Sequence, residues 1–119
     1  MSGIIAAMSV GWGLLTVTCS DINKGGFNST ITTLSADGAA SGGSGSYTFT
    51  WTFDSGDPSI IVMSVTDPHT TFRAQGLEPE ASVSSVFLLT ATDTLSGQSA
   101  SVSITVTITR HGTGDGGNL

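Results

Sequence analysis

The chain contains few of the residues on which nucleic-acid binding and disulfide-stabilised folds depend. Its 119 residues include three basic and nine acidic side chains, one cysteine and two histidines, and the formal net charge is −6. Nucleic acids and anionic membrane surfaces attract proteins through clustered positive charge, so we expect neither as a partner. The single thiol, Cys19, has no second cysteine to pair with, which excludes a fold held together by internal disulfides.

Charge of either sign is scarce, yet the chain is apolar enough to fold. Charged residues make up 10% of the sequence and hydrophobic residues 38%, whereas disordered chains combine high charge with low hydrophobicity. A length of 119 residues suits one domain with one modest core. The many small and β-branched residues favour short strands joined by glycine-containing turns.

The sequence also lacks the residue patterns of a catalytic centre. His69 and His111 stand far apart and have no cysteine or acid at metal-ligand spacing. The serines lie outside any Gly-x-Ser-x-Gly motif, and no paired acids accompany them. We therefore expect a protein that is not an enzyme and has no metal centre or cofactor. Cys19 shares a strand face with Leu15 and Val17, which favours a buried, inert thiol.

Acidic side chains in the predicted turns leave two interpretations open. Asp54 and Asp57, together with Asp37 or Asp93, could supply oxygen ligands to calcium. However, the sequence has no Asp-x-Asp-x-Asp spacing, and aspartate in turns commonly bonds to its own backbone. The pattern favours the turn-forming role.

The clearest structural signal is the stretch GGSGSYTFTWTF at 42–53, in which aromatic residues alternate with threonines. A strand directs alternate side chains to opposite faces, so four aromatic rings share one face and three hydroxyls share the other. A second alternating run, at 99–109, carries valine and isoleucine between serine and threonine. These runs and the strand at 83–92 predict a core built from Tyr47, Phe49, Trp51, Phe53, Phe87, Leu89, Val102, Ile104, Val106 and Ile108.

Short strands separated by turns, with no amphipathic helix, predict an all-β fold: a single Ig-like β-sandwich of about seven antiparallel strands. We expect turns or loops at 21–28 and 36–46, and a short edge strand at 70–74. The expected strands lie at 13–19, 30–35, 47–53, 60–65, 70–74, 83–92 and 99–109.

The segments SGGSGSYTFTWTF at 41–53 and FLLTATDTLSGQSASVSITVTI at 87–108 resemble polycystic-kidney-disease-type (PKD) immunoglobulin-like domains. In that family a Gly/Ser turn precedes a Tyr-x-aromatic-x-Trp strand, and the closing hairpin turns at a glycine after Thr-Asp. The resemblance covers residues 13–109 and implies an Ig-like sandwich. It also implies that Trp51 is the core tryptophan and that Asp93 and Gly97 form the last turn.

The sequence departs from that family after the tryptophan. The family often has Trp-x-Phe-Gly-Asp-Gly, whereas here WTF is followed by DSGD at 54–57. This variant is similar to the Ig-like modules of tailed-phage virion proteins, which share the GGSGSYT-x-x-W and TD-x-x-SGQ-x-A elements. The resemblance implies a non-enzymatic virion protein, which would be made in the host cytoplasm. Because the chain is short and has a single domain, we expect a capsid decoration protein in preference to a minor capsid or tail protein. The alternative is an adhesion module that binds a carbohydrate or a cell surface, with Trp12 and Phe27 as candidate exposed aromatics.

Two segments flank the predicted sandwich: an apolar arm at 1–12 and a Gly-rich tail at 110–119, which we expect to be flexible. The arm lacks the basic start of a signal peptide and is shorter than the roughly 20 apolar residues of a membrane span. Exposed apolar patches usually mark interaction surfaces. We therefore expect the arm to bind the major capsid or tail protein, or to build a homo-oligomer, through Ile4, Ile5, Met8, Val10 and Trp12. Trp12 has a second interpretation, in which it packs against its own sandwich.

Overall fold

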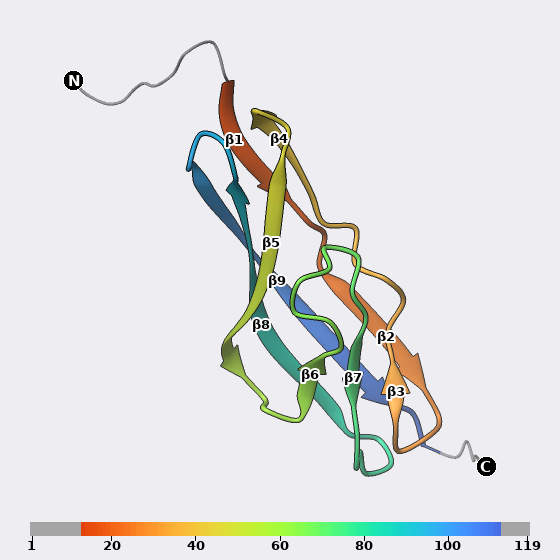
Figure 1. The fold of residues 1–119 in the computed structure, drawn as a ribbon. Helices are drawn as coiled ribbons and strands as arrows, with labels where there is room; N and C mark the ends of the chain where they lie inside the picture. The colour runs from red at the N-terminus through yellow and green to blue at the C-terminus, as the bar shows by residue number, and fades with distance from the viewer. Residues whose placement is uncertain (1–12, 113–119) are drawn as a thin grey trace.

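The computed structural model describes residues 13–112, which form nine strands arranged in two layers (Figure 1). These residues contain no helix long and apolar enough to cross a membrane. The strands are β1 (Gly13–Thr18), β2 (Ile22–Gly26), β3 (Ile31–Thr32), β4 (Ala39–Gly43), β5 (Tyr47–Gly56), β6 (Ile60–Val62), β7 (Phe72–Ala74), β8 (Ser82–Asp93) and β9 (Ser99–Arg110).

One layer is a four-stranded sheet in the order β2-β9-β8-β5. Its centre is the hairpin of β8 and β9, whose twelve-residue strands pair from Ser82↔Thr109 to Thr92↔Ser99. The other layer consists of a three-stranded sheet, β3-β7-β6, and a two-stranded ribbon, β1-β4. Backbone hydrogen bonds between residues 33–38 and 68–72 continue the pairing from β3 towards β4. The expected all-β sandwich is therefore confirmed.

The structure contains two strands that we expected to be turns or loops. β2 lies in the expected turn at 21–28, and β4 lies in the expected loop at 36–46. The glycines at 42 and 43 led us to expect a loop, but in the structure they allow the backbone of β4 to approach neighbouring groups closely. A Cβ on Gly42, whose φ is 85°, would lie 2.0 Å from the carbonyl oxygen of Leu14 on β1. The structure thus has nine strands where we expected about seven, because glycine-rich backbone can pair without β-forming side chains.

Two predictions about pairing were also wrong. β2 runs parallel to β9, from Ile22↔Val106 to Gly26↔Arg110, so the sandwich is not purely antiparallel. The strand expected at an edge, β7, instead lies between β3 and β6 at the centre of its sheet. Strand order depends on contacts between distant segments, and local residue patterns do not report these contacts.

The core lies between the four-stranded sheet and β3-β7-β6. Phe72 is fully buried at its centre, 5.2 Å from the ring of Trp51 and 4.9 Å from the ring of Phe87, measured between centroids. Aromatic pairs at these separations add to the free energy gained by burial. Of the ten residues expected in the core, six are buried: Trp51, Phe87, Leu89, Ile104, Val106 and Ile108.

The remaining four expected core residues are less completely covered. Tyr47, Phe49 and Val102 are half-buried. Phe53 is 44% exposed, so its assignment to the core was wrong. It packs edge-on against Phe87, but β5 is the edge strand of its sheet and its pairing with β8 shifts just after Phe53. The outer side of the Phe53 ring therefore remains open.

The sandwich extends slightly beyond the expected boundary at residue 109. β9 ends at Arg110, and the backbone amide of His111 donates to the carbonyl of Gly26 over 2.7 Å. Arg110 and His111, which we expected in the flexible tail, therefore belong to the sandwich. Residues 113–119 and the arm at 1–12 lie outside the described residues.

The different burial of the two phenylalanines predicts different costs of truncation. Phe72→Ala is expected to lower the free energy of unfolding by about 3–5 kcal/mol, because it leaves a cavity between Trp51 and Phe87. Phe53→Ala removes one edge-on contact and should cost about 1 kcal/mol. Urea denaturation of both variants measures the difference, and similar losses would contradict this description of the core.

Candidate interaction surfaces

One end of the sandwich is organised by the buried carboxylate of Asp93, the last residue of β8. Its oxygens accept hydrogen bonds from the hydroxyl of Ser44 over 2.6 Å, and from the amides of Leu95 and Ser96 over 2.9 and 3.0 Å. The amide of Ser44 donates to it as well. One side chain thus joins the β4–β5 turn to the β8–β9 turn.

These contacts set the charge state of Asp93. Burial alone would raise the pKa of its carboxyl, but the hydrogen bonds from Ser44, Ser96 and Leu95 outweigh burial and hold the pKa well below its usual range. Asp93 is therefore ionised at neutral pH. Gly43 makes the approach possible, because a Cβ on this residue would lie 2.1 Å from a carboxylate oxygen of Asp93.

The same end fixes the start of β1. The side chain of Gln98 accepts a hydrogen bond from the amide of Leu15 over 3.1 Å and donates to the carbonyl of Gly13 over 3.3 Å. β1 is thereby tied to the β8–β9 hairpin as well as to β4. Two apolar side chains stay exposed here, Leu14 at 81% and Leu95 at 68%. The point from which residues 1–12 extend is thus a well-anchored end with an apolar surface.

The five expected interface residues, Ile4, Ile5, Met8, Val10 and Trp12, all lie outside the described residues, so their interface role stays a prediction. The exposed Leu14 and Leu95 were not among the expected interface residues. Sequence reasoning assigned Leu14 to the first strand and Leu95 to a turn, and exposure is not visible in either pattern.

The opposite end is held by Arg110. Its guanidinium donates to the carbonyl of Phe27 over 3.2 Å and to the carbonyl of Leu77 over 2.7 Å, which ties two loops to the end of β9. Phe27 is 65% exposed, and the centroid of its ring lies 5.7 Å from the centroid of the His111 imidazole. This end therefore presents one exposed aromatic side chain beside a histidine.

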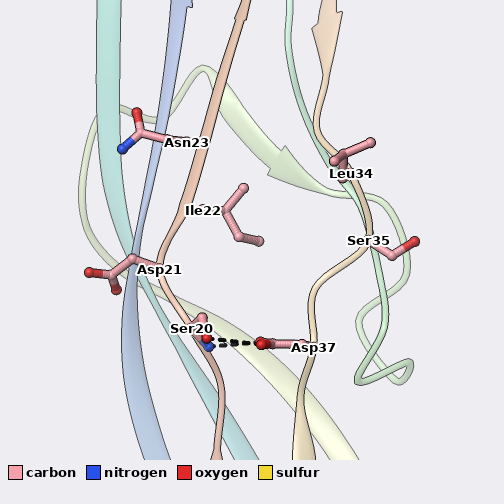
Figure 2. A pocket seen from close by; sticks show the side chains of 7 residues that line it. All are labelled: Ser20, Asp21, Ile22, Asn23, Leu34, Ser35 and Asp37. Atoms are coloured by element: carbon pink, nitrogen blue, oxygen red, sulfur yellow. Dashed lines mark hydrogen bonds between the residues drawn. The ribbon is translucent and has the colours of Figure 1, made fainter.

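A shallow groove of about 240 Å³ lies where the chain passes from β1 to β2. It is lined by Ser20, Asp21, Ile22, Asn23, Leu34, Ser35 and Asp37. Figure 2 shows Ser20 and Asp37 facing each other across it, with two hydrogen bonds from the amide and hydroxyl of Ser20 to the carboxylate, 2.8 and 2.9 Å long. These bonds lower the pKa of Asp37. Two of the polar side chains of the groove, those of Ser20 and Asp37, are thus bonded to each other.

Cys19, beside this groove, has the character of an unreactive thiol. Burial, followed by the hydrogen bond and the charge of Asp37, raises its pKa to about 11. Thiols react as thiolates, so this shift suppresses reactivity at neutral pH.

The aspartates considered as calcium ligands are dispersed. Within residues 13–112, no group of three or more His, Cys, Asp or Glu side chains could hold a metal ion. Asp57 accepts the amide of Ser59 over 2.9 Å, while Asp37 and Asp93 bond to Ser20 and Ser44. These three carboxylates stabilise turns and connections between strands.

The outer face of the β8–β9 hairpin is a neutral surface of hydroxyl groups. Its outward positions carry serine and threonine apart from Val86 and Leu88, and no charged residue. Hydroxyls of paired residues bond across the strands at 2.7–3.1 Å, in the pairs Ser82–Thr109, Ser84–Thr107, Thr90–Ser101 and Thr92–Ser99. The face is uncharged although the chain has a net charge of −6.

The role of Asp93 predicts a specific loss of stability. Asp93→Asn replaces a charged acceptor of several hydrogen bonds by an amide with one acceptor oxygen. We expect the melting temperature at neutral pH to fall by at least about 4 °C. Folding lowers the pKa of the Asp93 carboxyl, so this group stabilises the folded state at pH values above 3.8, its pKa in the unfolded chain. The stabilisation is lost as the pH falls below that value.

The difference in melting temperature between wild type and Asp93→Asn should therefore shrink below that pH. Circular dichroism melts between about pH 7 and about pH 3 measure it. Asp54→Asn, at an exposed position on β5, is the matched control. Equal melting temperatures for the two variants at neutral pH would show that the Asp93 contacts do not stabilise the fold.

Comparison with known proteins identifies related folds but no family. No protein-family model matches the chain, and no curated protein matches it. Among solved structures, it is similar to the PKD domain (329–428) of human KIAA0319, with a TM-score of 0.50 and 17% identity over 95% of this chain and 99% of that one. It is also similar to the titin M3 domain, with a TM-score of 0.42 and 16% identity over 83% and 98% of the two chains. At this identity the likeness to the PKD domain shows the fold alone: the chain is a PKD- and Ig-like β-sandwich.

Proposed function

We propose that the protein is a non-enzymatic structural component of a tailed-phage virion, a capsid decoration protein that binds the particle through residues 1–12. The sandwich acts as a scaffold that holds the arm at one end and presents a polar surface to solvent. The resemblance of the 41–53 and 87–108 segments to Ig-like modules of phage virion proteins supports the virion context.

The observation that carries this proposal is the construction of the end from which the arm extends. Asp93 and Gln98 bind this end together, while Leu14 and Leu95 expose apolar surface beside the first described residue. Exposed apolar surface on a rigid support is the usual character of a protein interface. Residues 1–12, which directly precede β1 in the chain, are likewise uncharged and apolar.

The test uses particles of the phage whose genome encodes the chain. We expect the protein in purified particles at high copy number, and density for an Ig-like sandwich on the capsid lattice in cryo-electron microscopy. A variant lacking residues 1–12 should fail to bind particles that lack the protein, whereas a variant lacking residues 113–119 should bind normally.

Other outcomes separate the competing roles. Density confined to the tail would replace decoration by a tail function. Absence from the particle, or full binding without residues 1–12, would overturn the proposal.

A second candidate function is adhesion to a carbohydrate or a cell surface, which the exposed ring of Phe27 favours, because aromatic side chains provide contact surface at binding sites. A glycan array with wild type and Phe27→Ala tests it. Binding that is lost in the variant supports adhesion, and an array without signal counts against it.

A further inference from the structure

The outer edge of β5 is covered in its middle and open at its start. β5 pairs only with β8, so its other side is an edge of the sheet. The amide of Trp51 points to this side, because it donates to the carbonyl of Val65 over 2.7 Å. Alternate residues of an antiparallel strand direct their backbone groups to the same side. The amides and carbonyls of Tyr47 and Phe49 therefore point outward too, and no backbone group within residues 13–112 pairs with them there.

The facing layer is incomplete at the same level. β4 pairs with β1 on one side, and no strand among residues 13–112 pairs with its other side. The segment that precedes β7 bonds to the segment that precedes β4 only as far as the hydrogen bond from the amide of Gly38 to the carbonyl of Pro68, 3.2 Å long. Figure 1 shows β4 and the start of β5 at the same end of the sandwich. The rings of Tyr47 and Phe49, on β5, are half-buried and pack edge-on with centroids 6.2 Å apart, and the hydroxyl of Tyr47 donates to the carbonyl of Gly42 on β4 over 2.6 Å. The start of the β5 edge thus combines unpaired backbone groups with half-buried aromatic side chains.

Nothing in the sequence protects this edge from pairing. Proteins usually block exposed edges with lysine, proline, bulges or inward charges. The open part of β5, YTFT at 47–50, has none of these and consists of residues that favour strands. The other edge of the same sheet, β2, is only five residues long and contains Lys24.

We propose that residues 1–12 of a second copy of the chain add as a strand to the open edge of β5 and cover Tyr47 and Phe49. This inference rests on the proposed function, in which the same residues form the binding arm, and it specifies their receptor within the assembled protein. Strand addition satisfies the unpaired backbone groups by hydrogen bonds, and alternate apolar side chains of the added strand pack on the exposed parts of the two rings.

The composition and attachment of the arm fit this receptor. Residues 1–12 carry no charged side chain, and in an extended strand Ile4, Met8 and Val10 would share one face. Twelve residues span up to about 40 Å in extended form, longer than the open edge. β1 begins at the extremity of the sandwich and runs from there towards its middle (Figure 1), so a straight continuation of β1 before Gly13 would point away from the body of the domain and from its own β5.

Hydrogen exchange, followed by NMR on the full chain, tests the proposal directly. The amides of Tyr47 and Phe49 should be protected at least about tenfold more in the full chain than in a variant lacking residues 1–12. The amide of Trp51 is the internal control, since its bond to Val65 keeps it protected in both proteins. Protection in the full chain should rise with protein concentration, because the arm comes from another molecule.

Sedimentation velocity provides a second measurement. The full chain should be dimeric at high concentration, and both the variant lacking residues 1–12 and Phe49→Lys should be monomeric, since lysine blocks strand addition. Phe53→Lys is the matched control. Phe53 lies on the same face of β5 as Phe49, but it is separated from the open edge by Trp51, whose amide bonds to Val65. The Phe53→Lys variant should therefore still form dimers.

The outcomes separate this inference from its alternatives. Protection that does not depend on protein concentration would mean that the arm pairs with β5 of its own molecule. This result would overturn the proposal that the arm comes from a second copy. Rapid exchange at Tyr47 and Phe49 in a dimeric full chain would place the arm elsewhere. Particle binding by a chain that stays monomeric with an open edge would overturn this inference and leave the proposed function intact. A chain that forms dimers through the β5 edge but does not bind particles would overturn the proposed function and leave the strand addition intact.

Discussion

The two layers of the sandwich are joined at Trp51, and much of the remaining structure depends on this residue. Its ring packs edge-on against Phe72, its indole nitrogen donates to the carbonyl of Asp67 over 2.8 Å, and its amide donates to Val65. A buried indole N–H without a partner is costly, so the chain at 65–67 has to pass beside it. That crossing covers the middle of the β5 edge and leaves its start open.

Each end of the molecule is stabilised by one charged side chain that bonds to neutral groups of the loops. The Asp93 carboxylate accepts from Ser44, Leu95 and Ser96, and the Arg110 guanidinium donates to two backbone carbonyls. Hydrogen bonds that involve a charge are stronger than neutral ones, which suits a chain with so few ionisable residues. The hydroxyl pairs on the sheet surface replace the charges that usually cover such a face.

Function in such a module depends on its ends and edges, because the sandwich interior serves the fold. The similarity to the PKD domain of KIAA0319, at 17% identity, shows the fold of the chain and does not identify a binding partner. The virion role therefore rests on the anchored apolar end around Leu14 and Leu95, and the assembly mode on the unprotected edge at 47–50. The apolar end lies at the start of β1, and the open edge lies at the start of β5.

Local patterns determined the fold class and most of the core. Alternation placed Trp51, Phe87 and Ile104 on buried faces, because a strand with one apolar face must bury it. Only the tertiary structure decided that β2 and β4 are strands, that Phe53 is exposed and that the edge of β5 is open. Parallel pairing, close backbone approach and edge position arise from contacts between segments far apart in the sequence, and no local pattern encodes them.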